Sequence, residues 1–107
     1  MITVNLRYTG TNDSARAFAE EMTSSGIVEK IRAEQGNLRY EYYQSLEDPE
    51  TILMIDSWED QAAIDVHHAS PMMQELARLR DKYDLHMSAE RFVRAEDNPE
   101  DEKFIRK

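Results

Sequence analysis

The sequence predicts an α+β fold of the ferredoxin-like type, with its elements in the order β-α-β-β-α-β. Four short segments have the composition or the period-two alternation of β-strands. Between them, two longer stretches carry apolar residues at helical spacing. Because sheet segments and helical stretches follow one another in this order, we expect an antiparallel sheet with the helices on one face.

The first half of this plan is a strand followed by a helix. Residues 2–8, ITVNLRY, alternate apolar and polar side chains and predict the strand. In the turn that follows, Asn12 or Asp13 can cap a helix. Apolar residues at i, i+3, i+4 and i+7 then predict that helix. The pattern weakens at residues 23–26 and resumes after them, so we expect one long helix with a kinked middle that ends near Gly36.

The second half is a hairpin, a helical region and a last strand. Residues 38–58 hold two strand-like segments around a turn-rich connection and predict the hairpin. Asp60 or Ser57 can begin the next helix. Pro71 interrupts the helical pattern and suits the first turn of a further helix. Residues 85–93 alternate again and predict the fourth strand.

Length and charge indicate one domain with a charged tail. The chain has 107 residues, which is a typical size for one domain, and we place that domain at residues 1–95. Residues 96–107 are densely charged and form a tail, although Phe104 and Ile105 could dock on a second copy. With 13 basic and 22 acidic residues the net charge is −9, which argues against nucleic acid or an anionic membrane as partner.

The sequence lacks cysteine and any long apolar segment, and these absences exclude several kinds of site and a membrane-spanning helix. The chain has no cysteine, which excludes a disulfide, a thiolate zinc site, an iron–sulfur cluster and a thiol nucleophile. Its longest apolar run, residues 52–55, is far shorter than the roughly 20 residues that span a bilayer. The first residues also lack the features of a signal peptide, so we expect a cytoplasmic protein.

The predicted sheet has apolar residues on both faces. In the third strand Met54 and Trp58 point to one side, and Leu53 and Ile55 point to the other. The helices can cover only one of these faces. We therefore expect a homodimer that forms through the open sheet face about a two-fold axis.

Residues 32–71 carry several short motifs whose order and spacing resemble one family. They are Arg32-x-Glu34-x-Gly36 with Tyr40, then Asp48-Pro49, Asp56-x-Trp58-x-Asp60, and finally Ala63, His67 and Ser70-Pro71. This pattern resembles the antibiotic biosynthesis monooxygenase family, including its quinol-monooxygenase-like small proteins. The resemblance implies a dimeric α+β barrel with a pocket between the helices and the sheet of each subunit.

The resemblance implies cofactor-independent oxygenation, in which a small phenol- or quinol-like compound reacts with O₂ and no metal or flavin takes part. Other members degrade haem, isomerise small phosphorylated carbonyl compounds, or have no established activity. Two alternatives therefore stay open for this chain: an isomerase of a small polar carbonyl compound, and a ligand-binding dimer without chemistry. Fold alone does not choose among them.

His67 and Asn5 are the candidate catalytic residues. His67 matches the family histidine on the last turn of its helix, where a neutral imidazole could take a proton from a phenolic hydroxyl. The alternative is a structural histidine bonded to a nearby group. Asn5 could bind substrate or peroxide, or face the dimer interface. Haem degradation is disfavoured, because His67 stands where that branch has tryptophan and Ala77 stands where it has histidine.

Aromatic residues and methionines are the candidate substrate-binding residues, each with core packing as the alternative role. They are Trp58, Tyr40, Tyr83, Met54 and Met72. Met72 stands where the family often has a second histidine. We expect His68 at the surface and no metal site, because His67 and His68 are adjacent rather than four residues apart. For Asp56 we expect an ion pair with Arg39 or Arg32.

Overall fold

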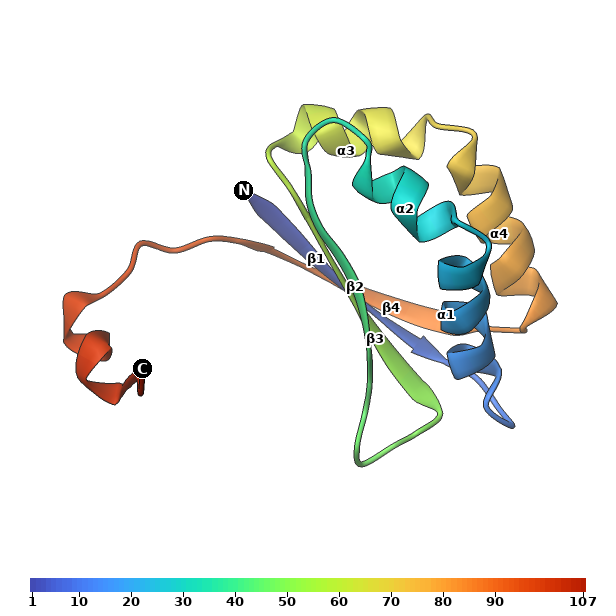
Figure 1. Cartoon of the computed structure of the whole chain (residues 1–107), viewed down its shortest axis with the longest axis horizontal. Helices are drawn as coiled ribbons and strands as arrows, with labels where there is room; N and C mark the ends of the chain where they lie inside the picture. Colours follow the sequence, from blue (N-terminus) through green and yellow to red (C-terminus); the bar gives the residue numbers. More distant parts are fainter.

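The computed structural model describes residues 1–107 and confirms the α+β fold (Figure 1). The helices and strands follow the predicted order, with each helical stretch divided in two. They are β1 Ile2–Thr9, α1 Ser14–Ser24, α2 Ile27–Arg32, β2 Asn37–Gln44, β3 Thr51–Trp58, α3 Gln61–His68, α4 Met72–Lys82, β4 His86–Val93 and a 3-10 helix, η1, Pro99–Phe104.

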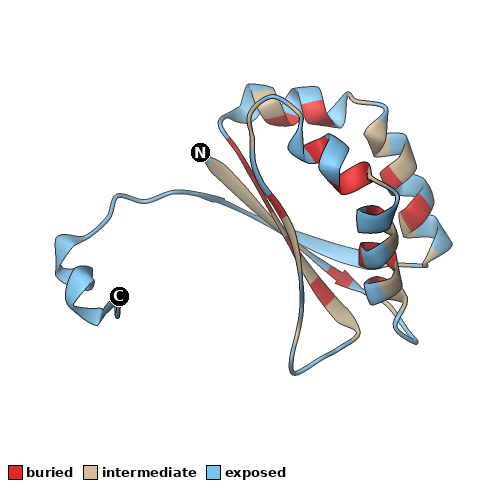
Figure 2. Cartoon of the chain, viewed as in Figure 1, coloured by how far each residue is buried: buried red, intermediate tan, exposed pale blue.

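The four strands form one antiparallel sheet in the order β2-β3-β1-β4. The four α-helices all lie on one side of this sheet (Figure 1). Fifteen buried apolar residues form one core cluster, and buried positions occur both on the sheet and on the helices that cover it (Figure 2). This two-layer packing is what the amphipathic helices and the alternating strands require.

The first helical stretch differs from the prediction, because it forms two helices instead of one kinked helix. Gly26 has φ +86° and stands at the N-cap of α2. That left-handed conformation is open to glycine but breaks a helix, so the weakened pattern at residues 23–26 marks a complete break. Gly36 has φ +85°, three residues after the C-cap of α2 at Ala33, and turns the chain into β2.

The helix caps follow the prediction at α3 and differ from it at α1. Asp60 caps α3, since its Oδ1 accepts a hydrogen bond of 2.9 Å from the Ala63 N–H. Asp13 stands at the N-cap of α1, but its side chain makes no capping bond. Instead, the Ser14 hydroxyl oxygen accepts from the Thr11 N–H at 3.0 Å. Thus the turn before α1 is closed by a serine that the sequence pattern did not single out.

Strand register assigns every sheet residue to one of two faces. Asp56 lies opposite Val4 on β1 and Tyr40 on β2, so all three are on the face that the helices cover. Asn5 and Ile55 lie opposite each other on the open face. The same parity places Leu53, Tyr43 and Phe92 on the open face, so Leu53 and Ile55 share one side of β3, as predicted. A dimer through this face stays a prediction.

Strand β4 is exposed along its whole length. All eight of its residues are solvent-accessible, on both faces, although it pairs with β1 over its whole length. The helical layer therefore leaves the β4 side of the sheet uncovered (Figure 2).

The chain after β4 extends away from the domain (Figure 1). Residues 96–107 are all exposed, including Phe104 at 80% and Ile105 at 55%. Docking of this segment on a second copy stays a prediction. No helix combines the length and the apolar character needed to cross a lipid bilayer.

Candidate functional site

A pocket of about 330 Å³ lies between the covered face of the sheet and helices α3 and α4. Ten of its fifteen lining residues are hydrophobic, and five are polar or charged. The polar and charged ones are Asp56, His67, His68, Arg80 and Arg91. An apolar cavity with a few convergent polar groups is the usual form of a small-molecule site.

His67 is held in this pocket by Glu34. The histidine lies on the last turn of α3 and is only 5% exposed. Its Nδ1 is 2.7 Å from Oε2 of Glu34, which lies in the turn between α2 and β2. A carboxylate can only accept a hydrogen bond, so Nδ1 carries the proton and donates it to Glu34. The other ring nitrogen, Nε2, makes no hydrogen bond within the chain and is not sealed from solvent.

Trp58 packs against His67 and orients a second acidic group. Its ring centroid is 4.7 Å from that of His67, and the two ring planes are tilted by 32°. The indole Nε1–H donates to Oδ2 of Asp56 at 2.8 Å. Trp58 is 1% exposed and lines the pocket. The indole is thus part of the core and part of the pocket wall, and its role in substrate binding stays a prediction.

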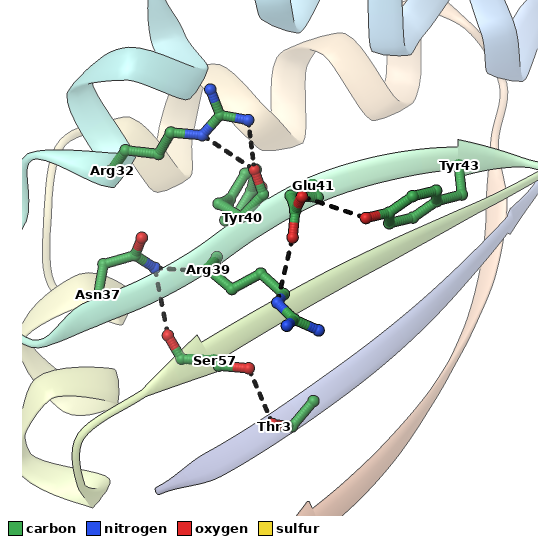
Figure 3. Close-up of polar contacts among 8 residues, drawn as sticks. All are labelled: Thr3, Arg32, Asn37, Arg39, Tyr40, Glu41, Tyr43 and Ser57. Carbon is green, nitrogen blue, oxygen red and sulfur yellow. Dashed lines mark hydrogen bonds and ion pairs between the residues drawn. The ribbon is translucent and has the colours of Figure 1, made fainter. Parts of the chain in front are cut away.

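Asp56 is a buried carboxyl group in the pocket lining, and the expected ion pair with arginine is absent. Arg32 donates instead to the Tyr40 carbonyl at 2.8 and 3.1 Å, and Arg39 pairs with Glu41 at 3.1 Å (Figure 3). The prediction for Asp56 was wrong because register turns it toward the helices while Arg39 faces the other way. Burial raises the pKa of Asp56 above its ordinary value, and its Oδ1 has no hydrogen-bond partner.

Two further predicted residues, Tyr40 and Met54, lie in the pocket lining beside Trp58 and His67. Tyr40 is 1% exposed, and its hydroxyl has no hydrogen-bond partner. Burial raises the pKa of the Tyr40 phenol far above its ordinary value, so the hydroxyl stays protonated.

Three other predicted residues lie outside the pocket. Asn5 is on the open face of the sheet, opposite Ile55 and Glu90, so the strand separates it from His67. Tyr83 follows α4, and its hydroxyl donates to Glu21 on α1 at 2.5 Å. Met72 packs against the core, and its neighbour Met73 lines the pocket in its place.

The pocket also contains charged residues that sequence reasoning missed. Arg80 comes from α4, and Arg91 comes from β4. Neither has a carboxylate partner: Arg80 donates to the Tyr8 hydroxyl at 2.8 and 3.1 Å, and Arg91 donates to the Gln61 side chain. His68 is exposed, as expected, but it reaches the pocket rim beside His67. Glu34 is part of the motif Arg32-x-Glu34-x-Gly36, and its place in that motif is the one feature of the sequence that points to it.

The side chains of this pocket do not form a metal-binding cluster. No three histidine, aspartate or glutamate residues of the chain lie close enough together to hold a metal ion.

The sequence of this chain matches a known protein family. The model of the antibiotic biosynthesis monooxygenase family matches residues 1–79. A curated relative, "Putative monooxygenase YcnE" of Bacillus subtilis, is 29% identical over 51 residues, which are 48% of this chain. The match covers 54% of that relative, so the chain aligns with about half the length of the curated protein.

Solved structures agree in fold. One is described as a putative antibiotic biosynthesis monooxygenase from Deinococcus radiodurans; it has TM-score 0.79 and 17% identity, and the match covers 92% of this chain and 96% of that one. SnoaB, described as a cofactor-independent oxygenase from Streptomyces nogalater, has TM-score 0.74 and 16% identity over the same shares. PA3566 from Pseudomonas aeruginosa has TM-score 0.75 and 25% identity, with 89% and 94% covered.

Proposed function

The chain belongs to the antibiotic biosynthesis monooxygenase family, and we propose that it oxidises a small electron-rich aromatic compound with O₂, without a metal or flavin. One observation carries this proposal: the hydrogen-bonded pair of His67 and Glu34 in a pocket that is otherwise mainly apolar. A base that a carboxylate orients, in an apolar pocket, suits proton removal from a phenol.

The His67–Glu34 pair fixes which nitrogen can act as the base. Since Glu34 takes the Nδ1 proton, the lone pair of neutral His67 is on Nε2. Nε2 would accept the proton of a phenolic hydroxyl bound in the pocket. Glu34 stabilises the imidazolium that forms, as the carboxylate of a catalytic triad does.

The chemistry that follows balances with O₂ as the only oxidant. The phenolate gives one electron to O₂, and the resulting aryloxyl radical and superoxide combine through a new carbon–oxygen bond. Protonation of the peroxide by the His67 imidazolium, cleavage of the O–O bond and loss of the proton on that carbon give a quinone carbonyl and water. One oxygen atom of O₂ enters the product, and the other leaves as water.

The remaining wall residues would position the substrate. Trp58 offers an aromatic face on which a planar ring can stack, and Met54 and Tyr40 complete that part of the wall. Asn5, Tyr83 and Met72 have no part in this proposal, since each lies outside the pocket.

We propose a homodimer through the open sheet face as the working form. Its support is the apolar group of Leu53, Ile55, Tyr43 and Phe92 on a face that no helix of the chain covers. A second copy would shield these side chains from water. Location in the cytoplasm stays a prediction from the sequence.

Oxygen consumption with a panel of hydroquinones and naphthols, without added metal or flavin, tests the monooxygenase proposal. General-base assistance contributes about 10² to 10⁴ in rate, so His67→Gln should lower turnover by that range. His86→Gln is the control, because His86 lies on the open face of β4. Equal rates for the two variants would assign His67 a structural role.

A second candidate is an isomerase of a small polar carbonyl compound. Arg7 and Arg39 lie on the open face, but Arg80 and Arg91 line the pocket and lack carboxylate partners, so they could bind a phosphate or carboxylate. Isomerisation needs no oxidant. Conversion of a phosphorylated hydroxycarbonyl compound under nitrogen, followed by phosphorus NMR, would favour this candidate. Binding of substrates without any turnover would instead identify a ligand-binding dimer.

A further inference from the structure

Two buried polar atoms in the pocket lack hydrogen-bond partners, and they come from one cross-strand pair. Asp56 on β3 lies directly opposite Tyr40 on β2, so their β-carbons are roughly 5 Å apart. Both residues line the pocket. Asp56 Oδ1 and the Tyr40 hydroxyl are each buried without a partner.

Neighbouring contacts hold the Asp56 side chain and the Tyr40 backbone in place. The Trp58 indole occupies Oδ2 of Asp56, which leaves Oδ1 as the free end of the carboxyl group. The backbone of Tyr40 is tied to the end of α2, because the Arg32 guanidinium donates twice to its carbonyl (Figure 3). Asp56 Oδ1 is therefore held in a fixed position without a hydrogen-bond partner, and the buried Tyr40 hydroxyl on the neighbouring strand makes no hydrogen bond of normal geometry.

An unsatisfied buried polar group is costly, so a partner from outside the chain is expected. Asp56 Oδ1 needs a donor while the carboxyl group is ionised, and the protonated Tyr40 hydroxyl can donate. A group that both donates and accepts could satisfy both atoms, and a hydroxyl is the simplest such group. Water also has this property, and so does a hydroxyl carried by a ligand.

We infer that Asp56 and Tyr40 form a hydroxyl-recognition subsite in the pocket. A ligand hydroxyl other than the one that gives its proton to His67 donates to Asp56 Oδ1 and accepts from the Tyr40 hydroxyl, while the ligand ring lies among the apolar wall residues. The subsite selects hydroxylated aromatic compounds over their alkyl ethers. This inference rests on the proposed function only in assigning the substrate to this pocket, since recognition requires no turnover.

Anaerobic binding isolates recognition from oxidation. We would measure the affinity of 2-naphthol and of 2-methoxynaphthalene by calorimetry, because the ether cannot donate the hydrogen bond. The unmodified protein should bind 2-naphthol about tenfold more tightly or better. Tyr40→Phe and Asp56→Asn should each reduce that ratio about fivefold or more.

Tyr83→Phe is the control. Tyr83 follows α4 and lies outside the pocket, and its hydroxyl donates to Glu21 on α1 at 2.5 Å. This variant should keep the ratio of the unmodified protein. If Asp56→Asn does not fold, as judged by circular dichroism, Tyr40→Phe still decides the result.

Several outcomes would overturn the subsite: similar affinities for the two ligands, binding of neither, or a ratio that Tyr40→Phe leaves unchanged. The last would mean that ordered water satisfies both atoms in the bound state. A hydroxyl preference that Tyr40→Phe reduces, in a protein that consumes no oxygen, would support the subsite and contradict the proposed function. Oxygen consumption by a protein that shows no preference for the hydroxylated ligand would support the proposed function and contradict the subsite.

Discussion

Glu34 Oε2 and His67 Nδ1 are 2.7 Å apart, although the two residues are separated by 33 positions in the sequence. Glu34 lies in a turn and His67 on the last turn of α3, so the contact depends on how two segments pack. Both side chains are largely shielded from solvent, with 17% and 6% exposure. The low exposure of the pair strengthens the hydrogen bond between them.

Glu34→Gln should lower turnover without unfolding the protein. The glutamine oxygen can still accept from Nδ1, but the charge that stabilises the imidazolium is lost. We expect a fall in the oxygen consumption rate of about tenfold or more, and no larger than the fall caused by His67→Gln. Glu29→Gln on the exposed surface of α2 should change the rate little. A Glu34→Gln enzyme with full activity would remove Glu34 from the mechanism.

Asp56→Asn should stabilise the protein at neutral pH. Burial raises the pKa of Asp56 above its ordinary value of 3.8, so the folded state binds this proton more tightly than the unfolded chain. This proton binding stabilises the folded state fully at pH values below the ordinary pKa of Asp56. The stabilisation is lost as pH rises through the pKa of Asp56 in the folded state. Asparagine carries no charge at any pH and keeps the oxygen that accepts from Trp58.

Thermal unfolding between about pH 4 and pH 8 tests whether the pKa of Asp56 is raised in the folded state. The Tm of Asp56→Asn should exceed that of the unmodified protein increasingly as pH rises, and the two should converge at low pH. Asp81→Asn, which removes an exposed charge from α4, is the control. A Tm difference that grows toward low pH would contradict a raised pKa.

Gly36→Ala should destabilise the fold more than Gly26→Ala. Both glycines have positive φ, so each alanine costs about 1–3 kcal/mol of backbone strain. Only at Gly36 would the new methyl group also meet a neighbour, the Ala63 β-carbon of α3, at 2.5 Å. The contact would push the turn that carries Glu34 away from α3.

The two glycine variants can be compared by thermal unfolding and by oxygen consumption. Gly26→Ala should lose Tm and keep its specific activity, since nothing lies within 4 Å of its new β-carbon. Gly36→Ala should lose more Tm and also specific activity. If both variants lose the same amount, the approach of Gly36 to α3 has no role in the pocket.

Ile55→Glu should convert the proposed dimer into a monomer. Ile55 lies in the centre of the open face, where a carboxylate would have to be buried against the second copy. Val66→Glu is the matched control, because Val66 is 64% exposed on α3. Light scattering should give two chain masses for the unmodified protein and the control, and one for Ile55→Glu. A monomeric unmodified protein would exclude the dimer.

Removal of residues 96–107 should leave Tm within a few degrees of the full chain. All of these residues are exposed, and they extend away from the domain (Figure 2). Terminal segments without buried contacts contribute little to stability. A large fall in Tm, or a shift from dimer to monomer, would show that Phe104 and Ile105 dock on the second copy.

The strands and the helical regions could be predicted because their signals are local. Alternation defined the two faces of each strand. Because Asn5 lies between Val4 and Leu6 in the strand, alternation already placed it on the other face of the sheet from these two residues. The same parity brought Tyr40, Met54 and Trp58 into the pocket. The break at Gly26 was underestimated, because a weakened helical pattern does not separate a kink from two helices.

The site residues that the sequence did not predict come together through packing between segments that are distant in the chain. Glu34 lies in a turn, and no periodicity reports which way a turn side chain points. Arg80 and Arg91 are charged residues on α4 and on an exposed strand, where a solvent role is the ordinary expectation. Tyr83 follows α4 and contacts α1, a contact that depends on how the two helices pack.

The alternation along β3 restricts where this chain can change in length during evolution. Ile52, Met54, Asp56 and Trp58 face the helices, and the residues between them face the other way. An insertion of one residue in β3 before Asp56 would reverse the faces of the residues that follow it, and would place the carboxyl group and the indole outside the pocket. Additions to the turn at residues 45–50 leave both sets in place. We therefore expect homologues to vary in length at this turn and to keep the length of β3 constant.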